Sequence, residues 1–348
     1  MKLITRKHKE DREQVLKLSG FLSEEYALSS ETQGRRNPEE RVSQWRTEYE
    51  RDYDRIIYSE AFRRLRNKTQ VVLMPLDQLL TTRMTHSYEV LQVALRNCSH
   101  LGLNETLAAA IALGHDLGHI PFGHAGESAL TKIMKDLLHD PSYEFHHARY
   151  GLDIVDRVEK GGRGLNLTEE VRDGILKHSL GASGLDKDMD LPITYEGKVV
   201  RLADKLAYTC SDLEDALRLE MIRESDIPQA EFKLLGPRKS KWIGSLNRNF
   251  VEMSIAEGDI CLKGDHLDAF EVLRSFMYKN VYGGGKLKAE FKKAKRMIEL
   301  VFDHVMENRF SDLDQKEAAY KTLDVVAGMT DQSLLTYFQE EFVPQRVY

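Results

Sequence analysis

The stretch Ala108-Ala-Ala-Ile-Ala-Leu-Gly-His115-Asp116-Leu-Gly-His119-Ile-Pro-Phe-Gly-His124-Ala-Gly-Glu127 joins an apolar run to a segment rich in histidine. The run has the composition of a buried helix, and it ends at His115 and Asp116. Imidazole and carboxylate groups are common metal ligands, and a hydrophobic pattern predicts neither of them here. We therefore expect a helix that carries a metal site at its end.

The composition is that of a soluble globular protein. The chain has 348 residues, 41% hydrophobic and 30% charged, enough to bury a sizeable core in one large domain or two small ones. No stretch reaches the roughly 18 apolar residues that span a bilayer, and the start of the chain lacks the apolar core of a secretion signal. Cys98, Cys210 and Cys261 suggest neither a disulfide framework nor a zinc-type pair. We expect a cytoplasmic protein that does not contact a membrane.

The net charge of −6 hides two basic clusters. One lies at residues 63–68 and the other at residues 238–241. Such clusters are candidates for binding anionic partners, but neither proves a nucleic-acid site.

Apolar residues recur mostly at helical spacing, which predicts a mainly α fold. Helices are expected from about Thr85 to Gly102, from Asn104 to the His-Asp pair, from about Gly126 to Leu138, from about Gly197 to Met221 and again from His266. Asn104 is a good N-cap, and Gly102 suits a left-handed helix end.

One segment of the C-terminal part predicts strands. Residues 250–262 alternate around a Glu-Gly-Asp turn, which is typical of a β-hairpin. The glycines of Tyr282-Gly-Gly-Gly-Lys286 predict a break between later helices. No linker demands a boundary, so we expect a single domain over residues 1–348. Its core would span about 60–220, with a helical extension that contains the hairpin at about 230–345.

A metal site needs more ligands than the adjacent pair. Neighbouring residues of a helix point about 100° apart, so other helices must complete the set. His86, at the start of its predicted helix, and Asp204, inside an apolar helix, are the candidates. A lone histidine is more often a core residue, and Asp204 could pair with Arg201 or Lys205. Mixed imidazole and carboxylate ligation suits a catalytic Mg, Mn, Fe, Ni or Co ion rather than a closed structural zinc site.

His86, His115, Asp116 and Asp204 resemble the H…HD…D ligand set of the HD superfamily of metal-dependent phosphohydrolases. The segments 51–71, 82–87, 114–127, 173–179, 196–208, 273–282 and 327–331 are similar to the deoxyguanosine triphosphate triphosphohydrolases, and the resemblance covers roughly residues 30–345. It implies an HD-domain helical fold, a divalent metal, and hydrolysis of a dNTP to the deoxynucleoside and tripolyphosphate. It also implies a homo-oligomer.

Two segments depart from the family pattern. Phe145-His-His-Ala-Arg-Tyr-Gly151 stands where many relatives have Phe-x-His-Asn-x-Gln-Ser, and Thr209-Cys-Ser211 stands where many have Ile-Asn-His. His147 keeps the motif's histidine in changed surroundings. The changed positions are His146, Ala148, Tyr150, Gly151, Cys210 and Ser211. They are where substrate preference or a regulatory contact could differ.

Release of tripolyphosphate calls for a general acid, because an alkoxide is a poor leaving group at neutral pH. His124 is the candidate, and Glu127 is spaced to hold its imidazole in the donor tautomer. Alternatively, Glu127 only favours the N-terminus of the next helix. His119 and His147 are secondary candidates for contacts to substrate or water. The ordinary surface or core histidines are expected to be His139, His146, His178 and His266.

A triphosphate needs cations around it. Arg83 and Lys205, near His86 and Asp204 in sequence, are spaced to meet the phosphates. Additional help could come from Arg63, Arg64 and Lys68, or these could form a solvated helix face.

One polar stripe interrupts the apolar helix that carries Asp204. It consists of Asp204, Tyr208, Asp212 and Asp215. The resemblance implies that Tyr208 and Asp212 lie near the deoxyribose and phosphates, and that Gln70 reaches the 3′ hydroxyl. A closely packed Tyr208 edge would exclude a 2′ hydroxyl.

The sequence thus predicts an enzyme that hydrolyses dGTP or several dNTPs, with a dNTP or single-stranded DNA as a candidate effector. One alternative is an HD phosphohydrolase acting on a nucleoside monophosphate or a guanosine alarmone. Another is a non-catalytic protein that senses nucleotides or binds nucleic acid. Retention of the four ligands together with His124 and Glu127 argues against the last.

Overall fold

The computed structural model describes residues 32, 34–37, 43, 45–73, 77, 79–179 and 190–344, and every regular element in this part of the chain is helical. The α-helices are α2 (Glu48–Ile57), α3 (Glu60–Arg64), α4 (Arg83–Leu101), α5 (Glu105–Gly114), α6 (Gly123–Leu138), α7 (His147–Asp153), α8 (Glu159–Gly162), α9 (Glu169–Lys177), α10 (Tyr195–Arg218), α11 (Gln229–Leu235), α12 (Lys239–Glu257), α13 (Asp265–Met277), α14 (Gly285–Phe310), α15 (Gln315–Ala327) and α16 (Asp331–Phe342). The short elements are the 3-10 turns η1 (Leu65–Asn67) and η3 (Glu224–Asp226) and the π-helical turns η2 (Ile154–Val158) and η4 (Tyr278–Tyr282).

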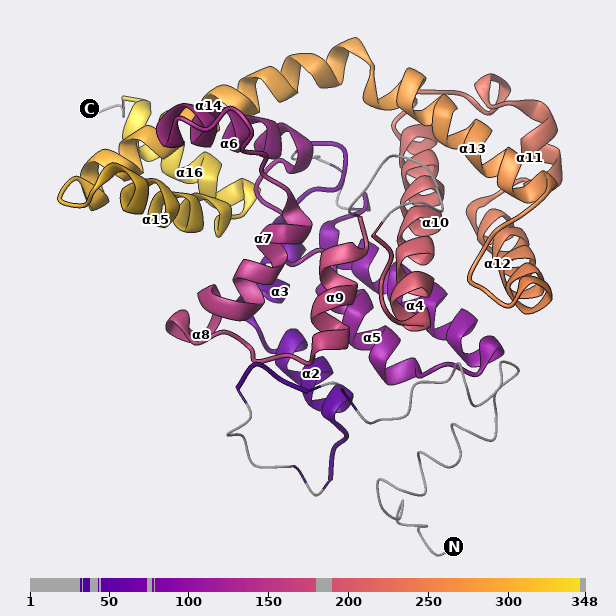
Figure 1. Ribbon diagram of the computed structural model, residues 1–348. Helices are drawn as coiled ribbons and strands as arrows, with labels where there is room; N and C mark the ends of the chain where they lie inside the picture. Colours follow the sequence, from indigo (N-terminus) through magenta and orange to yellow (C-terminus); the bar gives the residue numbers. More distant parts are fainter. Residues whose placement is uncertain are drawn as a thin grey trace, which may run out of the picture.

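The apolar helix α5 forms the centre of the core. Every residue from Leu107 to Gly114 is buried, and the helix packs against α2, α4, α9 and α10 (Figure 1). Asn104 caps its start by accepting hydrogen bonds from the backbone N–H groups of Thr106 and Leu107 at 3.0 and 3.1 Å. The surrounding helices therefore fix the position of the end of α5. His115 and Asp116 directly follow this end.

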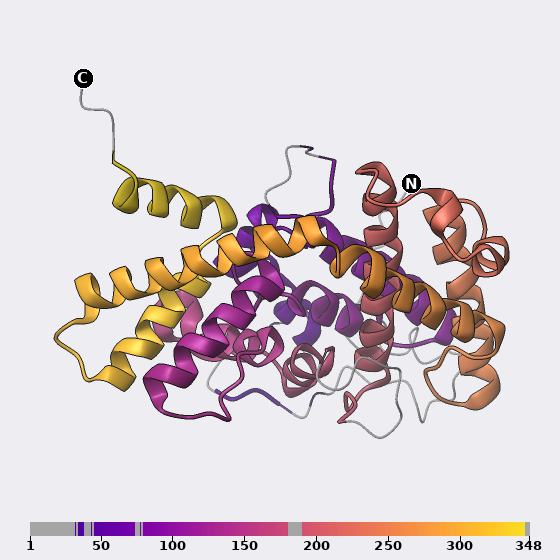
Figure 2. The same cartoon turned by 90° about the horizontal axis from the view of Figure 1, so that it is seen from above.

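Helix α6 and the C-terminal helices α11 to α16 form two groups on either side of this core (Figure 1). Helix α14 packs against α6, α15 and α16, and Figures 1 and 2 show it crossing from these helices toward α13. On the other side, α11, α12 and α13 contact one another, and both α12 and α13 contact α10. Among the helices that the structure describes, none combines the length and apolar character needed to cross a lipid bilayer.

The predicted helices are confirmed to within a few residues. Gly102 ends α4 in the left-handed conformation, with φ of 69°. The break at the glycines near residue 284 is also present, because η4 ends at Tyr282 and α14 begins at Gly285. Cap residues and helical periodicity together were sufficient to place these elements.

The predicted hairpin at residues 250–262 is wrong. Its first half belongs to α12, and the chain after Gly258 continues without regular structure to α13. Leu246, Phe250 and Ser254 are buried at intervals of four, whereas Ile255 is 45% exposed. The buried face therefore has helical spacing, and the alternation of apolar residues along the segment was coincidental.

Gly118 allows the loop after α5 to pack directly on α7. A Cβ atom at this position would overlap the His147 carbonyl oxygen and the Gly151 backbone nitrogen. Both obstacles are backbone atoms, which cannot rotate away as a side chain does. This contact fixes the loop that carries Asp116 against the helix that carries His147.

We expect Gly118→Ala to lower the free energy of unfolding by about 2 kcal/mol or more, because the overlap forces the two backbones apart. Urea unfolding followed by circular dichroism measures the change. Gly244→Ala is the matched control: it lies inside α12 with no atom within 4 Å of the added methyl group. It should raise stability by about 0.5 to 1 kcal/mol through helix propensity. Equal stabilities of Gly118→Ala and the wild type would contradict the packing argument.

Candidate metal centre

Side chains from three helices meet at one end of α5. His86 lies in the first turn of α4, His115 directly follows α5, and Asp204 lies within α10. One ligand atom from each lies within 4.8 Å of the others. His86 Nε2 is 2.9 Å and His115 Nε2 is 3.7 Å from Asp204 Oδ1, and Asp116 Oδ1 is 3.3 Å from His115 Nε2. The four predicted metal ligands are thus brought together.

The orientation of His115 suits a metal ion. Its Nδ1 donates a hydrogen bond to the Ala112 carbonyl at 2.7 Å, so the neutral ring has a lone pair on Nε2. This Nε2 is buried, has no hydrogen-bond partner within the described part of the chain, and faces the carboxylates of Asp116 and Asp204. A lone pair directed at carboxylate oxygens is unfavourable unless a cation lies between them. The residues present therefore fit a divalent ion.

Both carboxylates are available as ligands at neutral pH. Burial by itself would raise the pKa of Asp116, but the neighbouring His115, His119 and Arg83 hold it well below its ordinary value. Burial opposes the same effect at Asp204, whose pKa is lowered by the hydrogen bond from His86 and the nearby imidazoles. The cluster thus combines ionised oxygen ligands with imidazole nitrogen ligands.

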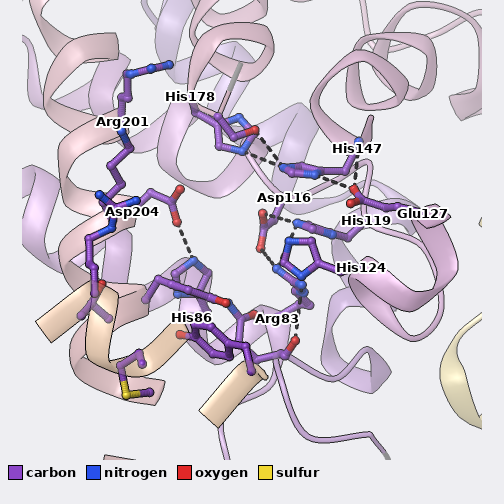
Figure 3. Close-up of a pocket in the computed structure, with 18 of the residues that line it drawn as sticks. Arg83, His86, Asp116, His119, His124, Glu127, His147, His178, Arg201 and Asp204 are labelled. Carbon is purple, nitrogen blue, oxygen red and sulfur yellow. Dashed lines mark hydrogen bonds and ion pairs between the residues drawn. The ribbon is translucent and has the colours of Figure 1, made fainter. Parts of the chain in front are cut away.

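A cavity of about 350 Å³ opens over this cluster (Figure 3). Figure 3 shows the carboxylates of Asp116 and Asp204 pointing into the same space. The cavity walls include most of the residues that the sequence predicted for catalysis or substrate binding. They are Gln70, Arg83, His119, His124, Glu127, His147, Lys205 and Tyr208.

Several polar groups are held beside the metal ligands. Arg83 is buried, and one of its terminal nitrogens lies 3.2 Å from Asp116 Oδ2 and 3.0 Å from His119 Nε2. Both amide atoms of the Gln70 side chain are buried without a hydrogen-bond partner in the part of the chain described. An unpaired buried amide is costly, so Gln70 is suited to a polar ligand in the cavity.

Glu127 does not hold His124 as the sequence predicted. Its Oε1 accepts a hydrogen bond from His147 Nδ1 at 2.7 Å and another from the His147 backbone N–H at 3.2 Å. The Glu127 carboxylate therefore binds His147 of α7, whereas the spacing in the sequence predicted His124 as its partner. His124 keeps an exposed surface that faces the cavity, and the surrounding protein lowers its pKa while the Glu127 charge acts in the opposite direction.

The predicted polar stripe of α10 is divided between two environments. Asp204 and Tyr208 line the cavity, but Asp212 lies outside its lining and accepts a hydrogen bond from the Tyr282 hydroxyl at 2.6 Å. Burial raises the pKa of Asp212 to about 7. Asp215 accepts from the Thr81 backbone N–H at 3.0 Å instead of facing the cavity.

The basic cluster at residues 63–68 does not reach the cavity. Arg63 is exposed, and Arg64 pairs with Glu60 at 2.6 Å. Lys68 is buried and donates hydrogen bonds to the carbonyls of His119 and Ala327. Lys68 therefore stabilises the loop that contains His119 without contacting the cavity.

Sequence reasoning missed several residues of the cavity. His178 was expected to be ordinary, yet its ring centre lies 5.0 Å from that of His115. His146, Arg201, Arg274, Tyr278 and Tyr282 also line the cavity. Arg201 could have been found, since it precedes Asp204 by three residues on one helix. His178 follows a separate helix, and no local pattern connects it with the metal ligands.

The departures from the family pattern mostly concern packing. Tyr150 donates a hydrogen bond to Asp324 at 3.1 Å, Cys210 is buried, and Ser211 donates to Glu89. Within these two segments, His146, His147 and Thr209 line the cavity, and Thr209 stands where many relatives have isoleucine.

Comparisons with known proteins identify relatives over most of the chain. The HD domain family model matches residues 83–209, and the model of a phosphohydrolase-associated domain matches residues 260–340. A deoxyguanosinetriphosphate triphosphohydrolase-like protein of Caldanaerobacter subterraneus is 39% identical over 93% of both chains. One of the same name from Desulfatibacillum aliphaticivorans is 40% identical over 93% of this chain and 95% of its own. A solved structure of a hypothetical protein from Aquifex aeolicus covers 84% of this chain and 71% of its own, with 18% identity and a TM-score of 0.41.

We expect His115→Asn to remove tightly bound metal and to leave the fold intact. The asparagine amide can replace the N–H that bonds to the Ala112 carbonyl, but no atom takes the place of Nε2. Metal affinity should fall by more than about 100-fold, since changes outside the ligand set already cost about 10- to 100-fold. Plasma mass spectrometry measures the metal content, and circular dichroism checks the fold. Substitution of the exposed His139 by asparagine is the control. An equal metal content of the two variants would contradict the assignment of His115 as a metal ligand.

Proposed function

The chain belongs to the family of deoxyguanosinetriphosphate triphosphohydrolase-like proteins, and we propose that it hydrolyses dGTP or several dNTPs to the deoxynucleoside and tripolyphosphate. One observation carries the proposal. The cluster of imidazoles and carboxylates forms part of a cavity that also contains cationic side chains, an unpaired amide and tyrosines. Such a cavity offers a suitable group to each part of a nucleotide.

His86, His115, Asp116 and Asp204 would hold the catalytic ion, with Mg, Mn, Fe, Ni and Co as candidates. When bound, such an ion polarises a phosphoryl oxygen and lowers the pKa of a water molecule. The lone pair of His115 Nε2 and the ionised carboxylates supply the negative potential that attracts it.

Cationic side chains around the cluster bind the phosphates in this proposal. Arg83, Arg201 and Lys205 all line the cavity. Arg83 is held by Asp116, and Arg201 donates a hydrogen bond to the Lys177 carbonyl at 2.6 Å. Guanidinium groups fixed in this way bind phosphate oxygens with less loss of side-chain entropy.

His124 donates the proton to the departing 5′ oxygen. Its surroundings lower its pKa in the free protein, and the negative charge of Glu127 acts against this. A bound polyphosphate adds more negative charge nearby. Like the charge of Glu127, it raises the pKa of His124 and favours the protonated ring. His147 holds Glu127 in place by the hydrogen bond at 2.7 Å, so Glu127 acts on His124 through its charge.

Tyr208 of α10 and Tyr282 of η4 select the sugar. The ring centres of Tyr208 and Tyr282 lie 5.8 Å apart, and the hydrogen bond to Asp212 fixes Tyr282. A packed aromatic wall of this kind leaves little room for a 2′ hydroxyl, while Gln70 offers its unpaired amide to the 3′ hydroxyl. Homo-oligomeric assembly, a cytoplasmic location and activation by a dNTP or single-stranded DNA stay predictions.

We expect incubation with a dNTP and Mn²⁺ to yield the deoxynucleoside and tripolyphosphate in equal amounts. A panel of the four dNTPs and four NTPs, with products resolved by ion-exchange chromatography, tests this and identifies the preferred base. His115→Asn is the inactive control. Release of orthophosphate or pyrophosphate would contradict the proposed reaction, and hydrolysis of only a nucleoside monophosphate or an alarmone would favour another HD phosphohydrolase. No hydrolysis of any nucleotide would favour a binding protein.

His124→Ala should lower kcat by ~10² to 10⁴-fold, the usual effect of losing a positioned proton donor. Metal content should stay at the wild-type level, because His124 is not among the proposed ligands. His146→Asn provides a control from the same cavity, since asparagine retains the cap that His146 Nδ1 gives to the Ala148 backbone N–H. A turnover of His124→Ala equal to that of the wild type would transfer the acid role to another residue.

A further inference from the structure

A second cavity lies between α4 and α12. Its volume is about 820 Å³, compared with about 350 Å³ for the cavity over the metal cluster, and the two cavities share no lining residue. Helices α4, α10 and α12 contact one another, and all three contribute to the walls of the second cavity (Figure 1). The basic cluster at residues 238–241, which takes no part in the metal centre, lies at this cavity.

Unpaired cations line the second cavity. Arg96 of α4, Arg238 before α12 and Arg248 within α12 all belong to its lining. Their guanidinium groups form no hydrogen bond or ion pair with any residue that the structure describes. Like charges around one space repel one another, so an anion that enters this space is stabilised by all of them. Guanidinium groups bind phosphate in particular, because their paired N–H donors match its oxygens.

The start of α12 adds a second source of positive potential. This helix begins at Lys239, and no side chain caps it. The first N–H groups of a helix have no intrahelical partner, and the helix dipole makes this end positive. Arg238, Lys239 and Ser240 all line the cavity, so the start of the helix opens onto it. Free N–H groups beside cationic side chains are a common arrangement for binding phosphate.

Polar groups of a different kind form another part of the lining. Asn97 and Asn247 are buried, and Asn97 Nδ2 donates a hydrogen bond to Asn247 Oδ1 at 3.2 Å. Asn97 Oδ1 is buried and has no hydrogen-bond partner in the described part of the chain, which is costly. The carboxylates of Glu214 and Glu252 also line the cavity, and ionised carboxylates only accept hydrogen bonds. A ligand that fits this part of the lining therefore carries hydrogen-bond donors.

The lining is poorly suited to a nucleotide base. Bases bind proteins mainly by stacking on aromatic side chains. The lining contains no phenylalanine, tyrosine or tryptophan, and its one imidazole belongs to the exposed His100. Amides and carboxylates instead suit the hydroxyl groups of a sugar.

We propose that the second cavity binds a sugar phosphate. The phosphate lies at the start of α12 beside the unpaired arginines, and the hydroxyl groups donate hydrogen bonds to the carboxylates and to Asn97 Oδ1. This site goes beyond the proposed hydrolysis, since none of its residues belongs to the metal centre. Its occupancy is therefore measurable without any nucleotide.

Isothermal titration calorimetry of the full chain with ribose 5-phosphate tests the proposal. Arg96→Gln and Arg248→Gln should each weaken binding by about 10-fold or more, the usual cost of losing a hydrogen bond between charged groups. Arg66→Gln removes an exposed arginine that lies outside both cavities, so it should bind like the wild type. Lys205→Gln changes the cavity over the metal centre and should also retain this binding.

Gly244→Leu tests the same cavity without removing a charge. Gly244 lines the cavity, and no atom lies within 4 Å of a Cβ atom added there, so the leucine side chain can extend into the open space. This variant should fold, as circular dichroism checks, and should lose the binding of ribose 5-phosphate.

Absence of binding, or equal affinity of the wild type and Gly244→Leu, would overturn the proposal. Loss of binding in Lys205→Gln alone would transfer the ligand to the cavity over the metal centre. Inorganic phosphate that binds as tightly as ribose 5-phosphate would reduce the site to one for simple anions. Tighter binding of adenosine 5′-monophosphate would contradict the choice of a sugar over a base. Each of these results would leave the proposed hydrolysis of dNTPs standing, because the product assay tests that reaction separately.

Discussion

The hydrogen bond from His115 Nδ1 to the Ala112 carbonyl leaves the lone pair of the neutral His115 ring on Nε2, the nitrogen that faces Asp116 and Asp204. The last carbonyls of a helix have no intrahelical partner, so the end of α5 offers an acceptor to the ring that follows it. The end of α9 does the same for His178 through the Ile175 carbonyl. Two helix ends thereby turn two Nε2 lone pairs toward Asp116. The Nε2 atom of His115 is buried without a hydrogen-bond partner in the described part of the chain, so a cation between it and the carboxylates of Asp116 and Asp204 would complement its lone pair.

The sequence predicted the helical framework and the ligand set because both follow local rules. Caps at Asn104 and Gly102 fixed the ends of two helices, and an ionisable residue in an apolar helix marked Asp204. The hairpin prediction failed because the alternation of apolar residues does not reveal that this segment forms α12, which packs against α4 and α10 with Phe250 buried. The partner of Glu127 and the role of His178 depend on tertiary contacts across α6, α7 and α9, which spacing in the sequence does not contain.

The C-terminal helices are physically tied to the cavity. Asp331, at the start of α16, accepts hydrogen bonds from the Thr69 backbone N–H at 3.1 Å and the Phe122 backbone N–H at 3.0 Å. Thr69 precedes Gln70, and Phe122, with a positive φ of 63°, begins the turn that leads to His124. A strained turn persists only where surrounding contacts fix it. The region that matches the phosphohydrolase-associated domain therefore holds two loops of the proposed substrate site in position.

The position of the site within the fold balances two opposing demands. A cluster of buried carboxylates and unshared lone pairs lowers stability, since charges and polar groups lose hydration without full compensation. The same features give the cluster its affinity for cations. The protein places this cluster where α5, α9 and α10 converge, and those helices bury apolar residues along their length. Packing energy from the core thus offsets the electrostatic strain at its edge, so the ligand geometry can persist before an ion arrives. A bound ion would relieve that strain, so metal affinity and fold stability are thermodynamically linked in this chain.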